Sequence, residues 1–144
     1  MRPLEEAKRD LTRQWVLRAE KDFRLAEHLV AEGCQYPEAI GFNCQQAAEK
    51  FLKAFLVLHQ TGFPKTHNLG ELLDLVAGID PALAETLREL TALNPYGVEY
   101  RYPSDFPEMM PSDAQAAFQL AQLARDGLMP RLASLGGAPP PGPE

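Results

Sequence analysis

Residues 42–56 read Phe42-Asn43-Cys44-Gln45-Gln46-Ala47-Ala48-Glu49-Lys50-Phe51-Leu52-Lys53-Ala54-Phe55-Leu56 and decide the fold. The stretch contains good helix formers and neither proline nor glycine, so it predicts one continuous α-helix. The apolar residues in and around it recur at helical spacing and form one broad face: Ile40, Cys44, Ala47, Phe51, Ala54 and Leu58. A helix with such a face packs against other helices in a core.

A polar stripe runs beside that apolar face, with members three and four residues apart: Gln45, Gln46, Glu49, Lys50 and Lys53. One interpretation is a solvated face, because Gln46 to Lys50 and Glu49 to Lys53 are pairs at the spacing that favours side-chain contact on a helix. The other interpretation is a functional site, because so many polar groups of mixed type are unusual on a helix that belongs to the core. The residues of this helix alone leave both open.

Apolar spacing and capping residues predict further helices on both sides of this segment. The first runs from about Leu4 to Glu32 and stops at Gly33, and the second starts at Tyr36-Pro37 and runs to about Gln60. Three more begin at residues that favour helix caps. Thr66 or Asn68 caps a short helix to Ala77, Asp80 precedes a helix with Pro81 in its first position, and Ser112-Asp113 caps a helix to about Ser134.

Residues 94–111 are predicted to form an ordered loop. They hold four prolines and four aromatic residues: Pro95, Pro103, Pro107, Pro111, Tyr96, Tyr100, Tyr102 and Phe106. So much proline argues against a helix, and leaving the aromatic side chains in water would be costly. A loop of this length inside a compact domain is often functional.

The fold class is therefore all-α. We predict an antiparallel up-and-down four-helix bundle with an additional short helix and a Pro/aromatic-rich loop. A chain of 144 residues fits one domain, which we assign to residues 1–135. Residues 136–144, rich in proline and glycine, are predicted to be a disordered tail.

Charge and cysteine content restrict the function classes. The net charge of −6 argues against broad nucleic-acid binding, which needs an extended basic surface. Two cysteines without metal-ligand spacing, no signal peptide and no long apolar run predict a cytoplasmic protein without a membrane span, a metal site or a cofactor.

Four segments resemble the HEPN family, the small helical domains of prokaryotic nucleotidyltransferase operons. They are Phe42–Leu56, Ala19–Ala26, Thr66-His67-Asn68-Leu69 and Tyr100-Arg101-Tyr102-Pro103, and the resemblance covers about residues 11–134. It implies a homodimer, a minimal nucleotidyltransferase as partner, nucleotide binding and a relation to toxin–antitoxin systems. Apolar and aromatic surplus at Trp15, Tyr36, Phe42 and Phe63 also favours a dimer.

Asp22 occupies a position where the apolar stripe of the first helix should continue. An ionised carboxylate there is costly unless it is paired. It either pairs with Arg18, four residues earlier on the same helix, or meets Lys50, Lys53 or Arg101 in the groove of the bundle. The family resemblance favours an acidic residue at this position.

Arg101 stands between Tyr100 and Tyr102. A guanidinium flanked by phenol rings suits a phosphate or carboxylate ligand with aromatic stacking. The alternative is that Arg101 only ties its loop to Glu49 or Asp22.

The ribonuclease branch of the HEPN family carries an arginine, four to six further residues and then a histidine. No arginine of this chain has a histidine at that spacing, so the sequence disfavours RNA cleavage. The predicted function is nucleotide binding by Gln45, Gln46, Glu49, Lys50, Lys53, Tyr100, Arg101 and Tyr102, supported by Asp22 and His67, with no catalytic residue assigned. The alternatives are an RNA-cleaving toxin in which His67 replaces the missing histidine, and a non-catalytic dimerisation scaffold.

Overall fold

The computed structural model describes residues 3–98 and 108–134, where every regular element is a helix. The long helices are α1 (Leu4–Ala31), α2 (Pro37–Leu58) and α6 (Pro111–Ser134). The shorter ones are α3 (Leu69–Ala77), α4 (Pro81–Thr86), the 3-10 helix η1 (Arg88–Leu93) and α5 (Asn94–Val98). The all-α prediction is confirmed. Tyr100, Arg101, Tyr102 and the predicted tail lie outside the described residues.

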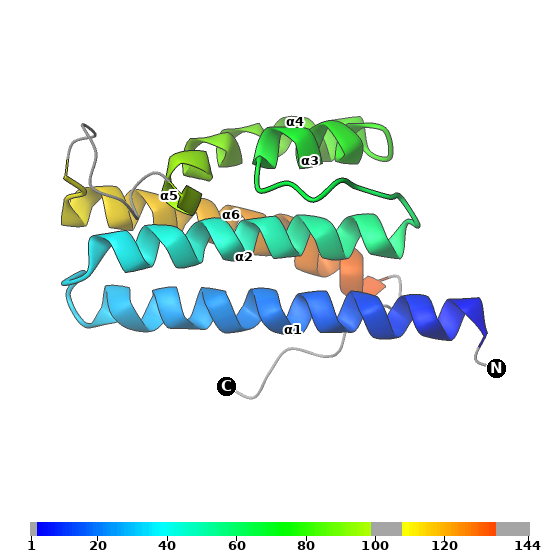
Figure 1. Ribbon diagram of the computed structural model, residues 1–144, viewed down its shortest axis with the longest axis horizontal. Helices are drawn as coiled ribbons and strands as arrows, with labels where there is room; N and C mark the ends of the chain where they lie inside the picture. The colour runs from blue at the N-terminus through cyan, green and yellow to red at the C-terminus, as the bar shows by residue number, and fades with distance from the viewer. Residues whose placement is uncertain (1–2, 99–107, 135–144) are drawn as a thin grey trace.

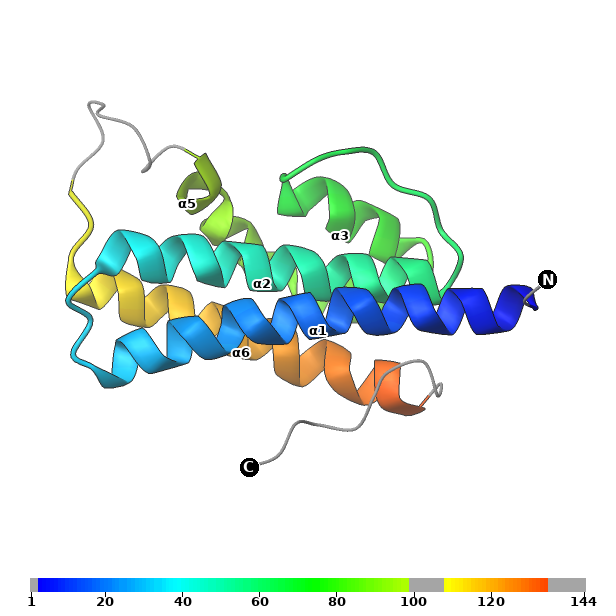
Figure 2. The same cartoon turned by 60° about the horizontal axis from the view of Figure 1, so that its bottom comes forward.

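Helix α2 is the centre of the bundle. It runs beside α1, the short helices α3 and α5 lie over it, and α6 packs against it from behind (Figures 1 and 2). Residues on all sides of α2 are buried, among them Ile40, Cys44, Ala47, Ala48, Phe51, Leu52, Ala54, Phe55 and Leu56. A helix that is buried on nearly every side forms the core instead of covering it.

Leu83, Leu87 and Leu90 recur at helical spacing after Asp80, but the α-helix that opens there is shorter than this spacing suggests. Helix α4 ends at Thr86, and η1 continues the chain from Arg88. Leu87, Leu90 and Leu93 are fully buried. Their spacing of three residues matches the 3.0 residues per turn of a 3-10 helix, so this winding keeps all three on the core side. The fourth position of the bundle is therefore built from short helices.

The prediction of a loop throughout residues 94–111 is wrong at its start, because Asn94–Val98 forms α5. Pro95 is tolerated there because the first N–H groups of a helix have no partner within it. Gly97 of α5 is buried against α2, and a Cβ added to it would lie 3.1 Å from the Gln45 side chain. The close approach explains glycine at this position.

Two of the predicted helix caps are confirmed and one is wrong. Asn68 Oδ1 accepts from the backbone N–H groups of Gly70 and Glu71, and Asp80 Oδ1 accepts from that of Leu83. Helix α6 instead begins at Pro111, so Ser112 and Asp113 lie inside it. Asp113 still serves the helix start, because its carboxylate accepts from the Met110 N–H at 2.8 Å. No helix in the described part of the chain is long and apolar enough to cross a membrane.

Candidate functional site

Glu49 is the centre of a buried polar network on α2. Its side chain is 4% exposed. Oε2 accepts a hydrogen bond from Lys53 Nζ at 2.8 Å, and Oε1 accepts one from Gln45 Nε2 at 3.1 Å. Oε1 also lies 3.0 Å from Nδ1 of His67. A buried carboxylate is tolerated when it is paired and hydrogen-bonded in this way.

The network keeps the Glu49 carboxylate ionised. Burial by itself raises the pKa of Glu49, but hydrogen bonds from Lys53, His67 and Gln45 and the positive charge of Lys53 lower it. The lowering effects outweigh burial, and the pKa lies below its ordinary value of 4.5. At neutral pH the group is therefore an acceptor with a full negative charge.

Lys53 is enclosed by aromatic rings as well as by Glu49. Its Nζ lies 5.5 Å from the ring centroid of Trp15 on α1 and 5.5 Å from that of Phe63 in the α2–α3 connection. The two rings meet edge to face, with centroids 6.3 Å apart. A desolvated ammonium between aromatic faces gains cation–π stabilisation. The sequence pattern did not predict that aromatic rings enclose Lys53, although it placed Trp15 among the apolar residues of the first helix.

His67 is held at two points while most of its ring remains accessible. Its backbone carbonyl accepts from Gln45 Nε2 at 3.1 Å, and its Nδ1 contacts Glu49. The side chain is nevertheless 69% exposed. Because the Glu49 carboxylate can only accept, Nδ1 carries the proton in this contact. The other ring nitrogen, Nε2, is then available to an outside group.

Asp22 and Lys50 join α1 to α2 through an ion pair of 2.6 Å. Both side chains are half-buried. The predicted pairing of Asp22 with Lys50 is confirmed, and the alternative pairing with Arg18 is wrong. Arg18 is exposed, and within the described residues it makes no ion pair. Packing of α1 on α2 brings Lys50 to the carboxylate, which spacing along one helix could not reveal.

The polar stripe of α2 thus divides into two parts. Gln45, Glu49 and Lys53 are buried and contact one another, whereas Gln46 and Lys50 lie nearer the surface. The parts touch where Gln46 Nε2 donates to Gln45 Oε1 at 2.7 Å.

The predicted residues Tyr100, Arg101 and Tyr102 lie outside the described residues, but both flanks of their segment are anchored on α2. A Cβ on Gly41 would lie 3.0 Å from both Tyr96 and Met109, so both side chains pack at this point of the helix. Gly97 lies one turn further along α2, against Gln45. The described residues Tyr96, Gly97 and Met109, which flank residues 99–107 in the sequence, therefore pack beside the first half of α2.

A family model described as the HEPN domain matches residues 12–126. This chain belongs to the HEPN family. The match spans α1 to α6 and includes every described residue of the candidate site. Comparison with curated proteins and with solved structures finds no significant match. The resemblance to the HEPN family that the sequence showed is thereby confirmed.

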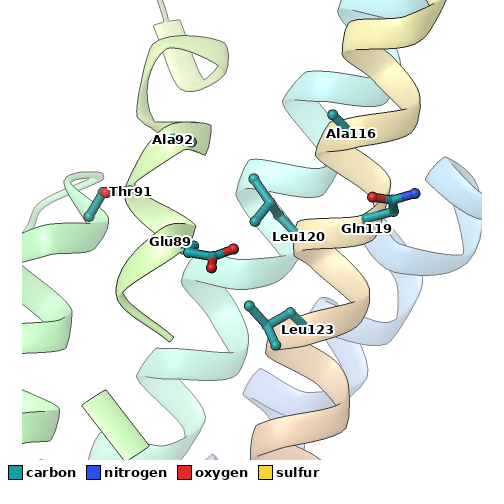
Figure 3. A pocket seen from close by; sticks show the side chains of 7 residues that line it. All are labelled: Glu89, Thr91, Ala92, Ala116, Gln119, Leu120 and Leu123. Carbon is teal, nitrogen blue, oxygen red and sulfur yellow. The ribbon is translucent and has the colours of Figure 1, made fainter. Parts of the chain in front are cut away.

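This HEPN domain also has a pocket that lies apart from the network. A pocket of about 710 Å³ opens between η1 and α6 (Figure 3), and none of the candidate site residues lines it. Its lining residues are Glu89, Thr91, Ala92, Ala116, Gln119, Leu120 and Leu123. In residues 3–98 and 108–134, no group of three or more histidine, cysteine or acidic side chains is placed to hold a metal ion.

Proposed function

We propose that this HEPN protein binds a phosphorylated nucleotide and acts as the partner of a minimal nucleotidyltransferase. The observation that carries the proposal is His67, an exposed imidazole fixed on a buried, ionised carboxylate. A histidine that served packing alone would gain little from having its exposed ring held in one orientation by a buried carboxylate. An imidazole whose orientation is fixed and whose Nε2 is open suits contact with a polar ligand.

The geometry suggests a division of roles among the candidate residues. Gln45 and Lys53 both donate hydrogen bonds to Glu49, and Gln45 also donates to the His67 carbonyl. We therefore assign these three residues the role of holding His67 in place. Lys50 and Gln46 are more accessible, and we assign them to the ligand together with His67. Lys53 and Lys50 are each paired with a carboxylate, but Lys53 is buried whereas Lys50 is half-buried, so Lys50 is the more accessible phosphate contact.

Arg101, Tyr100 and Tyr102 complete the proposed site. Arg101 is four residues from Gly97, and an extended chain of that length spans at most about 14 Å. Because Gly97 lies against Gln45, Arg101 is within reach of the network on α2. Glu49 and Asp22 are each paired with a lysine, so neither needs Arg101 as a counter-ion. This supports a role for Arg101 in binding phosphate, with a tyrosine stacked on the base.

Replacement of Arg101 by alanine should weaken nucleotide binding. Charge-assisted contacts contribute about 1.5–3 kcal/mol each, so affinity for ATP or AMP should fall roughly tenfold or more at low salt. Arg101→Lys should recover only part of the loss, because the bidentate fork is gone. Isothermal titration calorimetry with ATP, AMP and a dinucleotide measures this directly.

Arg88→Ala is the matched control, since Arg88 is a partly exposed arginine that pairs with Asp74 away from the network. It should leave the affinity unchanged. If no nucleotide binds at millimolar concentration, or if Arg101→Ala binds as well as the wild type, the polar stripe is structural and the scaffold alternative is favoured.

RNA cleavage is a second candidate, favoured by the same contact between Glu49 and His67. An imidazole with Nδ1–H on a carboxylate can accept a proton at Nε2, as a general base for a ribose hydroxyl must. The chain nevertheless lacks the arginine–histidine spacing of the ribonuclease branch. We therefore expect purified protein to leave single-stranded RNA intact. Specific cuts that disappear in His67→Gln would instead establish the second candidate.

The proposal of a nucleotidyltransferase partner is supported by family membership and not by a described surface. Co-expression of this chain with a minimal nucleotidyltransferase, followed by affinity purification, tests it. The toxin–antitoxin relation is proposed on the same basis, and growth arrest on expression of this protein that the partner relieves would support it.

A further inference from the structure

A second pattern runs along α1 beside the residues that face the core. Six residues alternate four and three positions apart along it: Leu11, Trp15, Arg18, Asp22, Leu25 and Leu29. This is the spacing of a coiled-coil seam. Leu11 and Leu25 are 46% and 47% exposed. Trp15 and Leu29 are only partly covered by the core. Leucines in such a row are left partly in water unless another helix covers them.

The seam is complementary to itself in one direction. When two copies of α1 run antiparallel with residue 20 at the two-fold axis, residues whose numbers add to 40 face each other. Leu11 then meets Leu29 of the partner subunit, Trp15 meets Leu25 of the partner subunit, and Arg18 meets Asp22 of the partner subunit. The same three layers repeat in reverse order beyond the axis.

A parallel pairing would not match in this way. It would put Arg18 against Arg18 of the partner subunit and Asp22 against Asp22 of the partner subunit. Like charges facing each other oppose association. The sequence of the seam therefore distinguishes between the two directions, and only the antiparallel one gives two layers with opposite charges.

We propose that α1 is the surface by which two copies of this chain associate, antiparallel and in this register. The partner completes a charge cluster at the candidate site. Lys50 occupies one carboxylate oxygen of Asp22, Oδ2, at 2.6 Å. The second oxygen accepts from Arg18 of the partner subunit, an exposed side chain without an ion pair among the described residues of its own copy. The inference concerns assembly and stands or falls independently of nucleotide binding.

The chain offers a matched pair of leucines for the test. Leu17 is 56% exposed on the same helix, as accessible as Leu25, but it lies outside the seam. Leu25→Glu and Leu17→Glu therefore make the same chemical change on and off the proposed surface. Arg18→Glu is the charge variant, because it places a glutamate opposite Asp22 of the partner subunit. Light scattering over a range of concentrations gives the mass of each variant.

The wild type should show twice the chain mass of 16.0 kDa at micromolar concentration. Leu25→Glu and Arg18→Glu should raise the dimer Kd by roughly a hundredfold or more, since loss of a central contact weakens binding about 30-fold and each dimer contains the change twice. Leu17→Glu should remain dimeric. Circular dichroism confirms that each variant is folded.

The register has its own measurement. A spin label on Ala7, an exposed residue 13 positions from the proposed two-fold axis, should give a distance between copies of roughly 40 Å. A parallel pairing would give a much shorter one. A monomeric wild type, a dimeric Leu25→Glu or a monomeric Leu17→Glu would overturn the surface, and a short label distance would overturn the register.

Discussion

Glu49→Ala should lower the free energy of unfolding by about 3–5 kcal/mol, the usual cost of removing one partner from a buried ion pair. The alanine leaves the Lys53 ammonium between Trp15 and Phe63 without its carboxylate. It also removes the acceptor of Gln45 and His67. Urea denaturation followed by circular dichroism measures the loss.

A double variant separates the ion pair from the rest of the network. Glu49→Gln with Lys53→Met removes both charges, so neither is left buried alone, and it should cost less than Glu49→Ala. Glu27→Ala, an exposed glutamate on α1, should change stability by no more than about 0.5 kcal/mol. A Glu49→Ala variant as stable as Glu27→Ala would show that the network contributes nothing to folding.

The wild type and a single Glu49→Gln variant should differ in their response to acid. The pKa of Glu49 is lower in the folded chain than its ordinary value of 4.5. Its ionisation therefore stabilises the fold above that value, and the stabilisation is lost as the pH falls through the folded pKa. Wild-type stability should drop more steeply below about pH 4.5 than that of Glu49→Gln, where this group is absent.

Phe51→Ala should cost about 3–5 kcal/mol, the range for removing a large aromatic side chain from a packed core. Phe51 is fully buried near the middle of α2, where α1 and α6 pack on the same helix. Tyr36→Ala is the control, since Tyr36 is 62% exposed at the start of α2 and should have little effect. Thermal and urea unfolding report both variants. A small loss for Phe51→Ala would mean that α2 is not the core.

Local sequence signals predicted most of the fold. The caps at Asn68 and Asp80 are short-range hydrogen bonds that depend on one residue type, so the sequence reveals them. The 3-10 winding of η1 and the helical start at Pro95 depend on what packs against them, and single-chain spacing does not contain that information. Proline content led to a loop prediction where a helix start could accept a proline.

The candidate site was less predictable than the fold. Helical spacing placed the polar residues of α2 in one stripe, but it could not show which neighbour covers each residue. The structure separates buried Glu49 from accessible Lys50 through what α1 and the α2–α3 connection bring against them. Pairing of Asp22 with Lys50 was one of several alternatives that the sequence left open, and packing decided it.

The central position of α2 affects how mutations of this protein have to be interpreted. One helix supplies both the main apolar core and five of the predicted site residues, Gln45, Gln46, Glu49, Lys50 and Lys53. A genetic screen for lost activity would therefore recover α2 substitutions for two unrelated reasons, loss of contact and loss of folded protein. Measuring cellular abundance beside activity separates them, because folding defects reduce the amount of protein while contact defects leave it unchanged.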